Sequence, residues 1–565
     1  MNIDSNPQNT VTLPSGARAH HEHAAQNDVI KKNFEAVRPG VWTFVGNGLS
    51  NQTFIEGPGG IIAIDSGESI EEMRAALHEL RIHTPRPIAA VIYTHFHYIE
   101  GTKAILEEGN HVNPLPIYGH EKIAYNRSRT SSEISPAYVR GLVEQFAMMM
   151  PLEGPDATVN IGLGFYYRNP AHAPFTPGHI PVTQPLADGS TTTIAGLRVE
   201  AYHAPSDADD SLTLWFPELA TCVHNLVWPT LFNIFAIRGE EYRDPQILIR
   251  GIDQLLGFEA EHLVATHGPG LSGGESIKTK VQRYRDSLQF LWDQTVRGIN
   301  KGLSTDQLAA SIKLPELYNV DYLTSERYGV AEHHVRQIHS GIRGWFDGDE
   351  SKLFPVEPTE RYGRLIAGFG GRDAVTRQAT ESLEKNDPRW ATELATWLVR
   401  SAGATQEDRN LLASCLRTIG ERTSAANIRN WCIARARHLD GSTPLDRLFG
   451  HRFTSRGLAD IETPLLIQTM RVLLDPTLVE GVSCQIRFVI DGETVGLHVR
   501  NCVAALTSGA DATNELVTTR AHLNALFNNK AKLSDLLASG DVVIRGDQGA
   551  VVATLAAFEI DGLRN

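Results

Sequence analysis

Two histidines separated by one residue, His95 and His97, are the most informative feature of this sequence. They lie in the segment THFHYIEG (residues 94–101), directly after residues 89–93, an apolar run typical of a buried strand. Neutral imidazole is the commonest protein ligand for zinc and related transition metals. Two imidazoles at positions i and i+2 of a loop at a strand end share a face, as two ligands of one ion must. The spacing therefore favours a metal site.

Further histidines strengthen this interpretation, because loops at strand ends are where catalytic groups tend to lie. Strands are predicted over residues 197–202, 220–223 and 262–266, and they are followed by His203, His224 and His267. The carboxylates close to this set of histidines are Glu100, Asp207, Asp209 and Asp210. Of these, Glu100 could supply an oxygen ligand, and the three aspartates lie just beyond His203.

The elements expected around these residues are sheets covered by helices. Strand-like residues 40–45 and 52–56 precede a buried strand over residues 61–67, which carries Asp65 near its end. A helical stretch then covers residues 69–82, before the strand that leads to His95. Residues 120–180 are irregular and rich in proline, tyrosine, asparagine and arginine. Long insertions of this kind are usually binding loops or lids.

The chain of 565 residues is too long for a single core, so several domains are expected. The sequence pattern predicts four parts: a flexible N-terminal tail over residues 1–30, the histidine-bearing domain over 31–275, a helical domain over 276–440 and a small α+β domain over 441–565.

Composition argues against several classes of function. The formal net charge is −14, whereas proteins that bind nucleic acid or anionic membranes without sequence specificity carry a basic face. No run of eighteen apolar residues is present, so no membrane span is predicted. There is also no signal peptide, and the expected location is the cytoplasm. The five cysteines form no C-x-x-C pair and are expected to be reduced, buried thiols.

The sequence resembles the alkyl sulfatases of the metallo-β-lactamase superfamily from about residue 38 to the end. NQTFIEG (residues 51–57) and AID (63–65) match the first strands of that group, and NIFAIRG (233–239) resembles a segment beyond its metal ligands. The most specific stretch is HSGIRGWFDG (339–348), which resembles the helical dimerisation domain of these enzymes.

The resemblance implies an α/β fold: an αββα metallo-β-lactamase sandwich, followed by an all-α dimerisation domain and a C-terminal α+β sterol-carrier-like domain with an apolar surface for alkyl chains. It also implies a homodimer and zinc, one or two ions per chain. The implied activity is hydrolysis of the sulfate esters of alkyl or similarly apolar alcohols by a metal-bound water. The partner would then be a small amphiphilic substrate.

The metal-binding motif departs from the family pattern, His-x-His-x-Asp-His-x-Gly-Gly. Ile99 stands where the pattern has aspartate, and Glu100 stands where it has the third histidine. A one-residue deletion would instead align residues 101 and 102 with the two glycines, and the sequence does not decide between these alignments. At the places of the family's glutamate ligands this chain has His203 and His224. Ile99 cannot bind a metal ion.

Three arrangements follow from these residues. A single ion binds His95, His97 and His203, with His224 and His267 in acid–base or supporting roles. Alternatively, a second ion is held by Glu100, His224 and His267, or the site is lost and the protein is a carrier. A metal enzyme is favoured because the strand-end histidines are retained, with two ions slightly preferred to one. The predicted metal ligands are His95, His97, His203, His224, His267 and Glu100, and the predicted catalytic residues are His224 and Glu100.

A sulfate ester also needs hydrogen-bond donors around its oxygens, and the planar fork of arginine suits a tetrahedral oxyanion. The predicted substrate-binding residues are Arg238, Asn233, Asn126, Arg127 and Arg129. Phe232 stands near the place of the family's catalytic acid histidine, with His224 as a candidate substitute. Two alternative functions stay open: hydrolysis of a different ester or ether bond by the same metal site, and non-catalytic transport of a lipid-like ligand.

Overall fold

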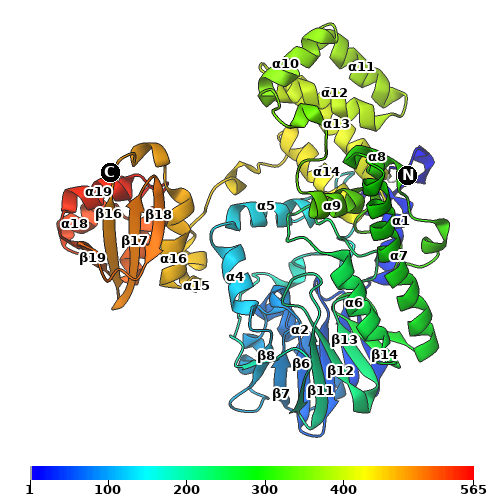
Figure 1. Cartoon of the computed structure of the whole chain (residues 1–565). Helices are drawn as coiled ribbons and strands as arrows, with labels where there is room; N and C mark the ends of the chain where they lie inside the picture. The colour runs from blue at the N-terminus through cyan, green and yellow to red at the C-terminus, as the bar shows by residue number, and fades with distance from the viewer. Residues whose placement is uncertain (1–2, 565) are drawn as a thin grey trace. The chain divides into compact units, whose positions relative to one another are not determined.

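The computed structural model describes residues 3–564, which form two compact units (Figure 1). The first unit consists of Met1–Ala124 and Arg140–Leu445, and the second of Tyr125–Val139 and Asp446–Asn565. The C-terminal α+β domain predicted from residue 441 thus begins close to the boundary between the units. The other predicted domain boundaries lie inside the first unit and stay predictions.

A seven-stranded sheet of the first unit carries the residues around His95. Its strands, in spatial order, are β3 (Asn33–Arg38), β4 (Val41–Val45), β5 (Gln52–Gly57), β6 (Gly60–Ile64), β7 (Ile88–Ile92), β8 (Ile117–Gly119) and β9 (Gln184–Pro185). The pairs from β3 to β6 are antiparallel, and those from β6 to β9 are parallel. Because β6 and β7 are parallel neighbours, Asp65 and His95 follow them at the same edge of the sheet.

A six-stranded sheet carries the other histidines. It consists of β10 (Ser190–Ile194), β11 (Leu197–His203), β12 (Leu212–Phe216), β13 (Thr221–His224), β14 (His262–Ala265) and β15 (Leu271–Ser272), in that order. All pairs are antiparallel except β13 with β14. The strand ends at His203 and His224, and the strand just before His267, agree with the sequence analysis.

The two sheets pack face to face around an apolar core that includes Ile64 and Ile92 from the first sheet and Val199 and Leu214 from the second. The helices α2 (Ile70–His83) and α3 (Lys103–Glu108) cover the outer face of the first sheet. On the other side lie α6 (Pro245–Leu256) and α7 (Gly274–Asn300), beside β13 and β14 (Figure 1). The expected αββα sandwich is therefore confirmed.

The N-terminal residues depart from the expected flexible tail. They form β1 (Thr10–Thr12), β2 (Arg18–His20) and α1 (His21–Val29), and Ala17 and Ala19 are fully buried. The segment is held by polar contacts as well as apolar ones, since the buried guanidinium of Arg429 donates hydrogen bonds to the carbonyl of Arg18. Hydrogen bonds of this kind leave no hydrophobic period in the sequence, which explains why the pattern predicted a tail.

After α7 the first unit is largely helical, as expected. Its helices are α8 (Thr305–Ser311), α9 (Ala331–Arg343), α10 (Pro358–Gly368), α11 (Arg372–Glu384), α12 (Pro388–Arg400), α13 (Gln406–Arg422) and α14 (Ala426–Leu439). All five cysteines are free thiols, and four of them are buried. Within residues 3–564, no helix combines the length and the apolar character needed to cross a membrane.

The second unit has a five-stranded sheet in the order β18 (Val503–Thr507), β17 (Glu493–Arg500), β16 (Cys484–Ile490), β19 (Asn514–Thr518) and β20 (Val543–Arg545). Its helices are α15 (Ser455–Asp460), α16 (Thr463–Met470), α17 (Arg520–Phe527), α18 (Leu533–Ser539) and α19 (Gln548–Ala556). A continuous apolar core joins sheet and helices, including Phe488 and Phe558. This is the α+β architecture expected for the C-terminal region.

Candidate metal centre

Three side chains converge at the edge of the first sheet: His95, His97 and Asp207. Their ligand atoms all lie within 4.8 Å of one another. Asp207 Oδ2 is 2.8 Å from His97 Nδ1 and 3.4 Å from His95 Nε2. Two imidazole nitrogens and one carboxylate oxygen around a common point are a donor set that zinc and related divalent ions accept.

The residues before His95 determine which of its nitrogens faces this point. The Asp65 carboxylate accepts hydrogen bonds from the Thr94 backbone N–H and hydroxyl, both at 2.7 Å. Since that hydroxyl gives its proton to Asp65, it can only accept from His95 Nδ1, 2.9 Å away. His95 therefore carries a proton on Nδ1, and Nε2, which faces Asp207, is the nitrogen that a metal ion could bind.

His97 is oriented in the opposite sense. Its Nδ1 faces Asp207, while its Nε2 lies 4.0 Å from the carboxylate of Glu240. A carboxylate beyond the ring of a metal-binding histidine commonly holds the second ring proton. Glu240 lies behind the ring in this way, but at 4.0 Å it makes no hydrogen bond to Nε2 of His97.

Buried polar atoms without a hydrogen-bond partner test whether this cluster fits a metal ion. Nε2 of His95 and Nε2 of His97 are both buried and make no hydrogen bond. A buried polar group without a partner is costly, and a bound cation would satisfy the one on His95 directly. The donor set therefore fits a divalent metal ion.

Asp207 is held as a carboxylate by the charges around it. Arg243 donates to Asp207 Oδ1 and to its backbone oxygen, and Arg238 Nη2 lies 3.7 Å from the same Oδ1. Burial by itself would raise the pKa of Asp207, but the charge of Arg243 outweighs it and holds the pKa well below its ordinary value. Arg243 is in turn anchored by Asn233 through Oδ1, at 2.6 Å.

The loop between β11 and β12 brings Asp207 to the histidines. Leu212, the first residue of β12, directly follows this loop. Its N–H donates a hydrogen bond to the carbonyl of Thr94 at 2.8 Å. This bond joins the second sheet to the start of the histidine loop. The two sheets therefore meet at the donor cluster, and each contributes part of it.

The residues that replace the family's second ligand pair do not join the cluster. Ile99 is fully buried in the apolar core beneath α2 and α3. Glu100 is partly buried, and its charge acts on Glu68 and Tyr93. Gly101 packs so closely that a Cβ atom there would lie 2.0 Å from the carbonyl oxygen of Ser66. The glycine is thus required by close packing. The role of Glu100 as ligand or catalyst remains a prediction.

His267 lies one step away from the cluster. Its Nδ1 donates to the carbonyl of Leu49 at 3.0 Å, which leaves Nε2 to accept from the Tyr98 hydroxyl at 3.4 Å. Burial lowers the pKa of His267 to about 4, and the charge of Asp207 offsets only part of this. His267 is therefore neutral at pH 7 and lies at the far side of Tyr98, whose ring packs edge-on against His95.

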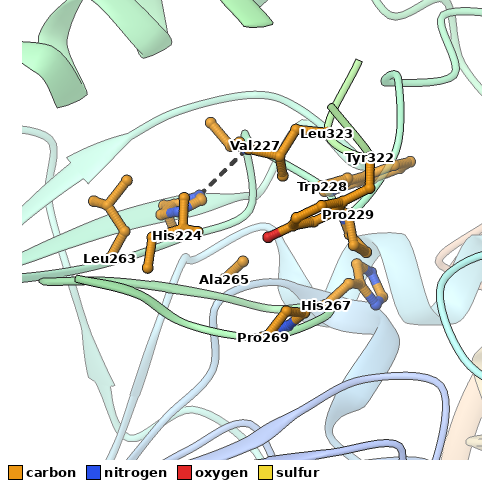
Figure 2. Close-up of a pocket in the computed structure, with 11 residues that line it drawn as sticks. His224, Val227, Trp228, Pro229, Leu263, Ala265, His267, Pro269, Tyr322 and Leu323 are labelled. Atoms are coloured by element: carbon orange, nitrogen blue, oxygen red, sulfur yellow. Dashed lines mark hydrogen bonds between the residues drawn. The ribbon is translucent and has the colours of Figure 1, made fainter. Parts of the chain in front are cut away.

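His224 occupies a separate small cavity (Figure 2). Its Nδ1 accepts hydrogen bonds from the N–H groups of Leu226 and Val227, and burial lowers its pKa to about 3. Figure 2 shows His224 and His267 on opposite sides of Ala265. The cavity measures about 10 Å³, the size of a single water molecule, so it cannot hold a substrate.

His203 also lies outside the cluster. Its Nε2 donates to the carbonyl of Leu186 at 2.9 Å, and its ring packs on His120 with centroids 4.1 Å apart. The structure therefore unites His95 and His97 with Asp207, and does not bring His203 or His224 to them.

The predicted substrate-binding residues fall into two groups. Arg238 is buried beside the donor cluster, where its Nη1 lies 2.5 Å from Glu240, and Asn233 supports Arg243. The others, Asn126, Arg127 and Arg129, lie on α4 (Ile123–Ser131) in the part assigned to the second unit. Their role in binding remains a prediction.

Sequence reasoning assigned no role to Arg243 or Glu240 and did not choose Asp207 as a ligand. Asp207 stood out only as one of three aspartates after His203. For Arg243 and Glu240 the sequence held no signal beyond their place after the segment NIFAIRG. Asp65 was visible as a carboxylate at the end of a strand.

Comparisons with known proteins agree over most of the chain. A family model described as "Alkyl sulfatase dimerisation" matches residues 304–442, and one described as "Alkyl sulfatase C-terminal" matches residues 454–560. The chain is 32% identical over 524 residues to a linear primary-alkylsulfatase of Pseudomonas sp. (strain ATCC 19151), covering 90% of this chain and 98% of that protein.

More distant relatives point the same way. An (R)-specific secondary-alkylsulfatase of Pseudomonas sp. is 27% identical over 547 residues, covering 93% of this chain and 80% of that protein. The solved structure of the stereoselective inverting sec-alkylsulfatase Pisa1 from Pseudomonas sp. has the same fold, with a TM-score of 0.82 at 24% identity. That match covers 95% of this chain and 86% of the other.

Proposed function

This chain belongs to the alkyl sulfatase family, and from that premise we propose that it hydrolyses the sulfate esters of linear alkyl alcohols. It is an enzyme of the sulfuric ester hydrolase class, as its resemblance to the alkyl sulfatases implied. The relative at 32% identity is named for linear primary alkyl sulfates, which favours unbranched primary chains as substrates here.

The observation that carries the proposal is the convergence of His95, His97 and Asp207. We assign these three as the protein ligands of one divalent ion. Zinc in hydrolytic sites is typically held by three protein ligands and keeps one position open. The assignment replaces His203 of the sequence-based set by Asp207. His224, hydrogen-bonded in its own cavity, is left out. A single ion per chain is therefore favoured over two, and zinc over other metals.

The charges around the cluster suit an anionic substrate. Two carboxylates, Asp207 and Glu240, are balanced by two guanidinium groups, Arg238 and Arg243. A divalent ion bound by His95, His97 and Asp207 would make this buried site net positive and would lower the pKa of a water molecule towards neutrality, so that this water could act as the nucleophile. Arg238, buried beside Asp207, offers N–H donors to sulfate oxygens, and Asn233 fixes the neighbouring Arg243.

Four expectations about partners and location accompany the proposal. The match to the dimerisation model supports a homodimer. The cytoplasmic location and the absence of nucleic-acid partners, both suggested by composition, remain predictions. The substrate is a small amphiphile with an anionic head.

The experiment that tests the ligand assignment compares Asp207→Ala with His203→Ala. Metal content per chain is measured by elemental analysis, and sulfate release from decyl sulfate is measured in parallel. We expect Asp207→Ala to lose the stoichiometric metal and about 100- to 1,000-fold in kcat/KM, the loss typical when an essential group is removed from such a site. His203→Ala should keep its metal and stay within about fivefold of wild type, the change left by an ordinary surface or packing substitution.

The opposite outcome would restore the sequence-based ligand set. If His203→Ala loses the metal while Asp207→Ala keeps it, Asp207 is not a ligand. Full sulfate release after exhaustive chelation would refute the metal-dependent function altogether.

A further inference from the structure

We propose that Gln145 is a positioning residue: it fixes the backbone of Arg238 and thereby sets how the Arg238 guanidinium meets the sulfate group of the substrate. The proposal rests on the sulfatase function and on the role of Arg238 proposed above. Gln145 is fully buried and is the last residue of α5 (Ser135–Gln145), which belongs to the first unit from Arg140 onward.

Arg238 depends on support from elsewhere in the chain, because no helix or strand contains it. It lies in the irregular segment between β13, which ends at His224, and α6, which begins at Pro245. Buried backbone groups in such a segment must find partners in other elements. The Arg238 side chain is itself buried beside Glu240. A buried guanidinium can receive an anion in a defined geometry only when the backbone that carries it is held in place.

The helix α5 holds Arg238 at both polar groups of its backbone. Gln145 Oε1 accepts a hydrogen bond from the Arg238 N–H at 3.1 Å. Gly141 lies one turn earlier on the same face of the helix. There it packs so closely that a Cβ atom would collide with the carbonyl oxygen of Arg238. One face of α5 therefore fixes the Arg238 N–H by a hydrogen bond and its carbonyl by close packing.

The orientation of the Gln145 amide follows from this contact. A backbone N–H can only donate, so the amide atom that faces Arg238 must be the oxygen. The amide nitrogen then faces the other way, and it donates to the hydroxyl oxygen of Tyr328 at 2.9 Å. Tyr328 is buried and lies near enough to Arg238 and Asp207 for their charges to act on its hydroxyl. The single amide of Gln145 thus joins two side chains beside the donor cluster.

Gln145 is itself anchored from behind. Its backbone carbonyl accepts a hydrogen bond from the fully buried Asn430 of α14 at 3.1 Å. Tyr328 is fixed by its ring, which packs edge-on against Trp228 with centroids 5.8 Å apart. Since a buried polar group without a partner is costly, Gln145 cannot turn away without leaving several groups unsatisfied.

The consequence for the reaction lies in sulfate binding. A displacement of about 1 Å in a positioned group can lower activity about 100-fold, even when the altered residue is remote from the reacting atoms. Arg238 would contact the sulfate group of the ester and free inorganic sulfate alike. Loss of its positioning should therefore raise KM and the inhibition constant for sulfate together, with kcat little changed.

The test is Gln145→Met in the full-length, metal-loaded enzyme, because methionine keeps the length of the side chain and removes both hydrogen bonds. We expect KM for decyl sulfate and the inhibition constant for inorganic sulfate to rise about 10- to 100-fold. The kcat should stay within about threefold of wild type, and the metal content per chain should be unchanged. Gln145→Glu keeps an oxygen acceptor for the Arg238 N–H and should recover most of the loss.

A double-mutant cycle shows whether Gln145 acts through Arg238. Arg238→Gln removes the guanidinium, so adding Gln145→Met to it should change the inhibition constant for sulfate by less than about twofold. Gly141→Ala displaces the Arg238 carbonyl and leaves the Gln145 amide intact. It should raise the same two constants, and it decides the question if Gln145→Met does not fold.

The matched control is Asn514→Leu in the second unit. Asn514 is also buried, accepts from a backbone N–H, that of Asp547, at 2.8 Å, and donates to the carbonyl of Gln485 at 3.0 Å. Its loss should leave KM and sulfate inhibition unchanged. Equal changes in Asn514→Leu and Gln145→Met, or full additivity in the cycle, would overturn the positioning role. A wild-type enzyme that releases no sulfate from alkyl sulfates would instead refute the proposed function, and the positioning role with it.

Discussion

Asp65 and Thr94 bear on the proposed metal centre through the tautomer of a single residue, His95. Neither side chain reaches the point where the three donors converge. Asp65 takes the proton of the Thr94 hydroxyl, which obliges His95 Nδ1 to be the donor in the next hydrogen bond. Such contacts behind a ligand typically change metal affinity 10- to 100-fold. Asp65 holds this position with a backbone φ of +56°, a strained value for a residue other than glycine.

Replacing Thr94 by valine removes the hydroxyl and keeps the shape of the side chain. We expect the dissociation constant for Zn²⁺ to rise 10- to 100-fold, because His95 is then free to carry its proton on either nitrogen. Competition with a chromophoric chelator measures the constant.

The matched control is Thr43→Val, which breaks another buried hydroxyl pair, Thr43 with Thr53 at 3.0 Å, inside the same sheet. That variant should bind metal as tightly as wild type. Equal weakening in both variants would mean that the effect is general destabilisation rather than control of His95.

At this scale the sequence identified two of the three members of the donor cluster. The i, i+2 spacing of His95 and His97 is a local property, so it could be seen without a structure. Asp207 could not be singled out, because the choice among Asp207, Asp209 and Asp210 depends on how the loop after β11 folds back onto Thr94. His203 was the reasonable expectation from the strand pattern, but its side chain turns to Leu186 and His120.

At the scale of elements, strands were predicted well because buried strands carry long apolar runs, as in residues 61–64 and 88–92. The N-terminal elements were not predicted, because their docking depends on buried polar groups. His23 on α1 is fully buried, and its Nε2 lies 3.1 Å from Asn160 Oδ1. Burial, reinforced by the charge of Arg429, lowers the pKa of His23 to about 3.

This histidine makes the docking of α1 sensitive to acid. Between pH 6.5, the ordinary pKa of histidine, and about pH 3, the pKa of His23 in the docked segment, His23 binds a proton only when the segment is undocked. Docking free energy is therefore complete above pH 6.5 and is lost as the pH falls, by about 1.4 kcal/mol per pH unit. Amide hydrogen exchange of residues 10–29, corrected for intrinsic rates, should show this loss between pH 7.5 and 5.5.

His23→Gln keeps a donor for Asn160 but has no proton to take up. At pH 7.5 residues 10–29 of this variant should be less protected from exchange than in wild type. As the pH is lowered, the docking free energy of the variant should decrease less steeply than that of wild type, by about 1.4 kcal/mol per pH unit. Identical slopes in the two proteins would show that another group controls the acid sensitivity of the segment.

At the scale of the molecule, the described surface of the first unit has several exposed apolar side chains in residues 342–356, the end of α9 and the stretch that follows it. Trp345 is 72% exposed and Phe354 is 91% exposed, with Ile342, Leu353 and Val356 also exposed. Large apolar side chains gathered in this way mark an interaction surface. The stretch lies within residues 304–442, which match the dimerisation model, so a second copy of this chain is the expected cover.

The double variant Trp345→Ser, Phe354→Ser tests this interface. Burying one large aromatic side chain contributes about 2 kcal/mol, which corresponds to about 30-fold in a dissociation constant. In a symmetric dimer each residue counts twice, so the double variant should be a monomer at micromolar concentration where wild type is a dimer. Sedimentation equilibrium measures the change.

Ile82→Ser, at a site that is 67% exposed on α2, is the control and should leave the dimer intact. A wild-type monomer at these concentrations, or a double variant that still dimerises, would place the interface elsewhere. Because His95, His97 and Asp207 all come from one chain, the monomer should retain its metal even where it loses stability.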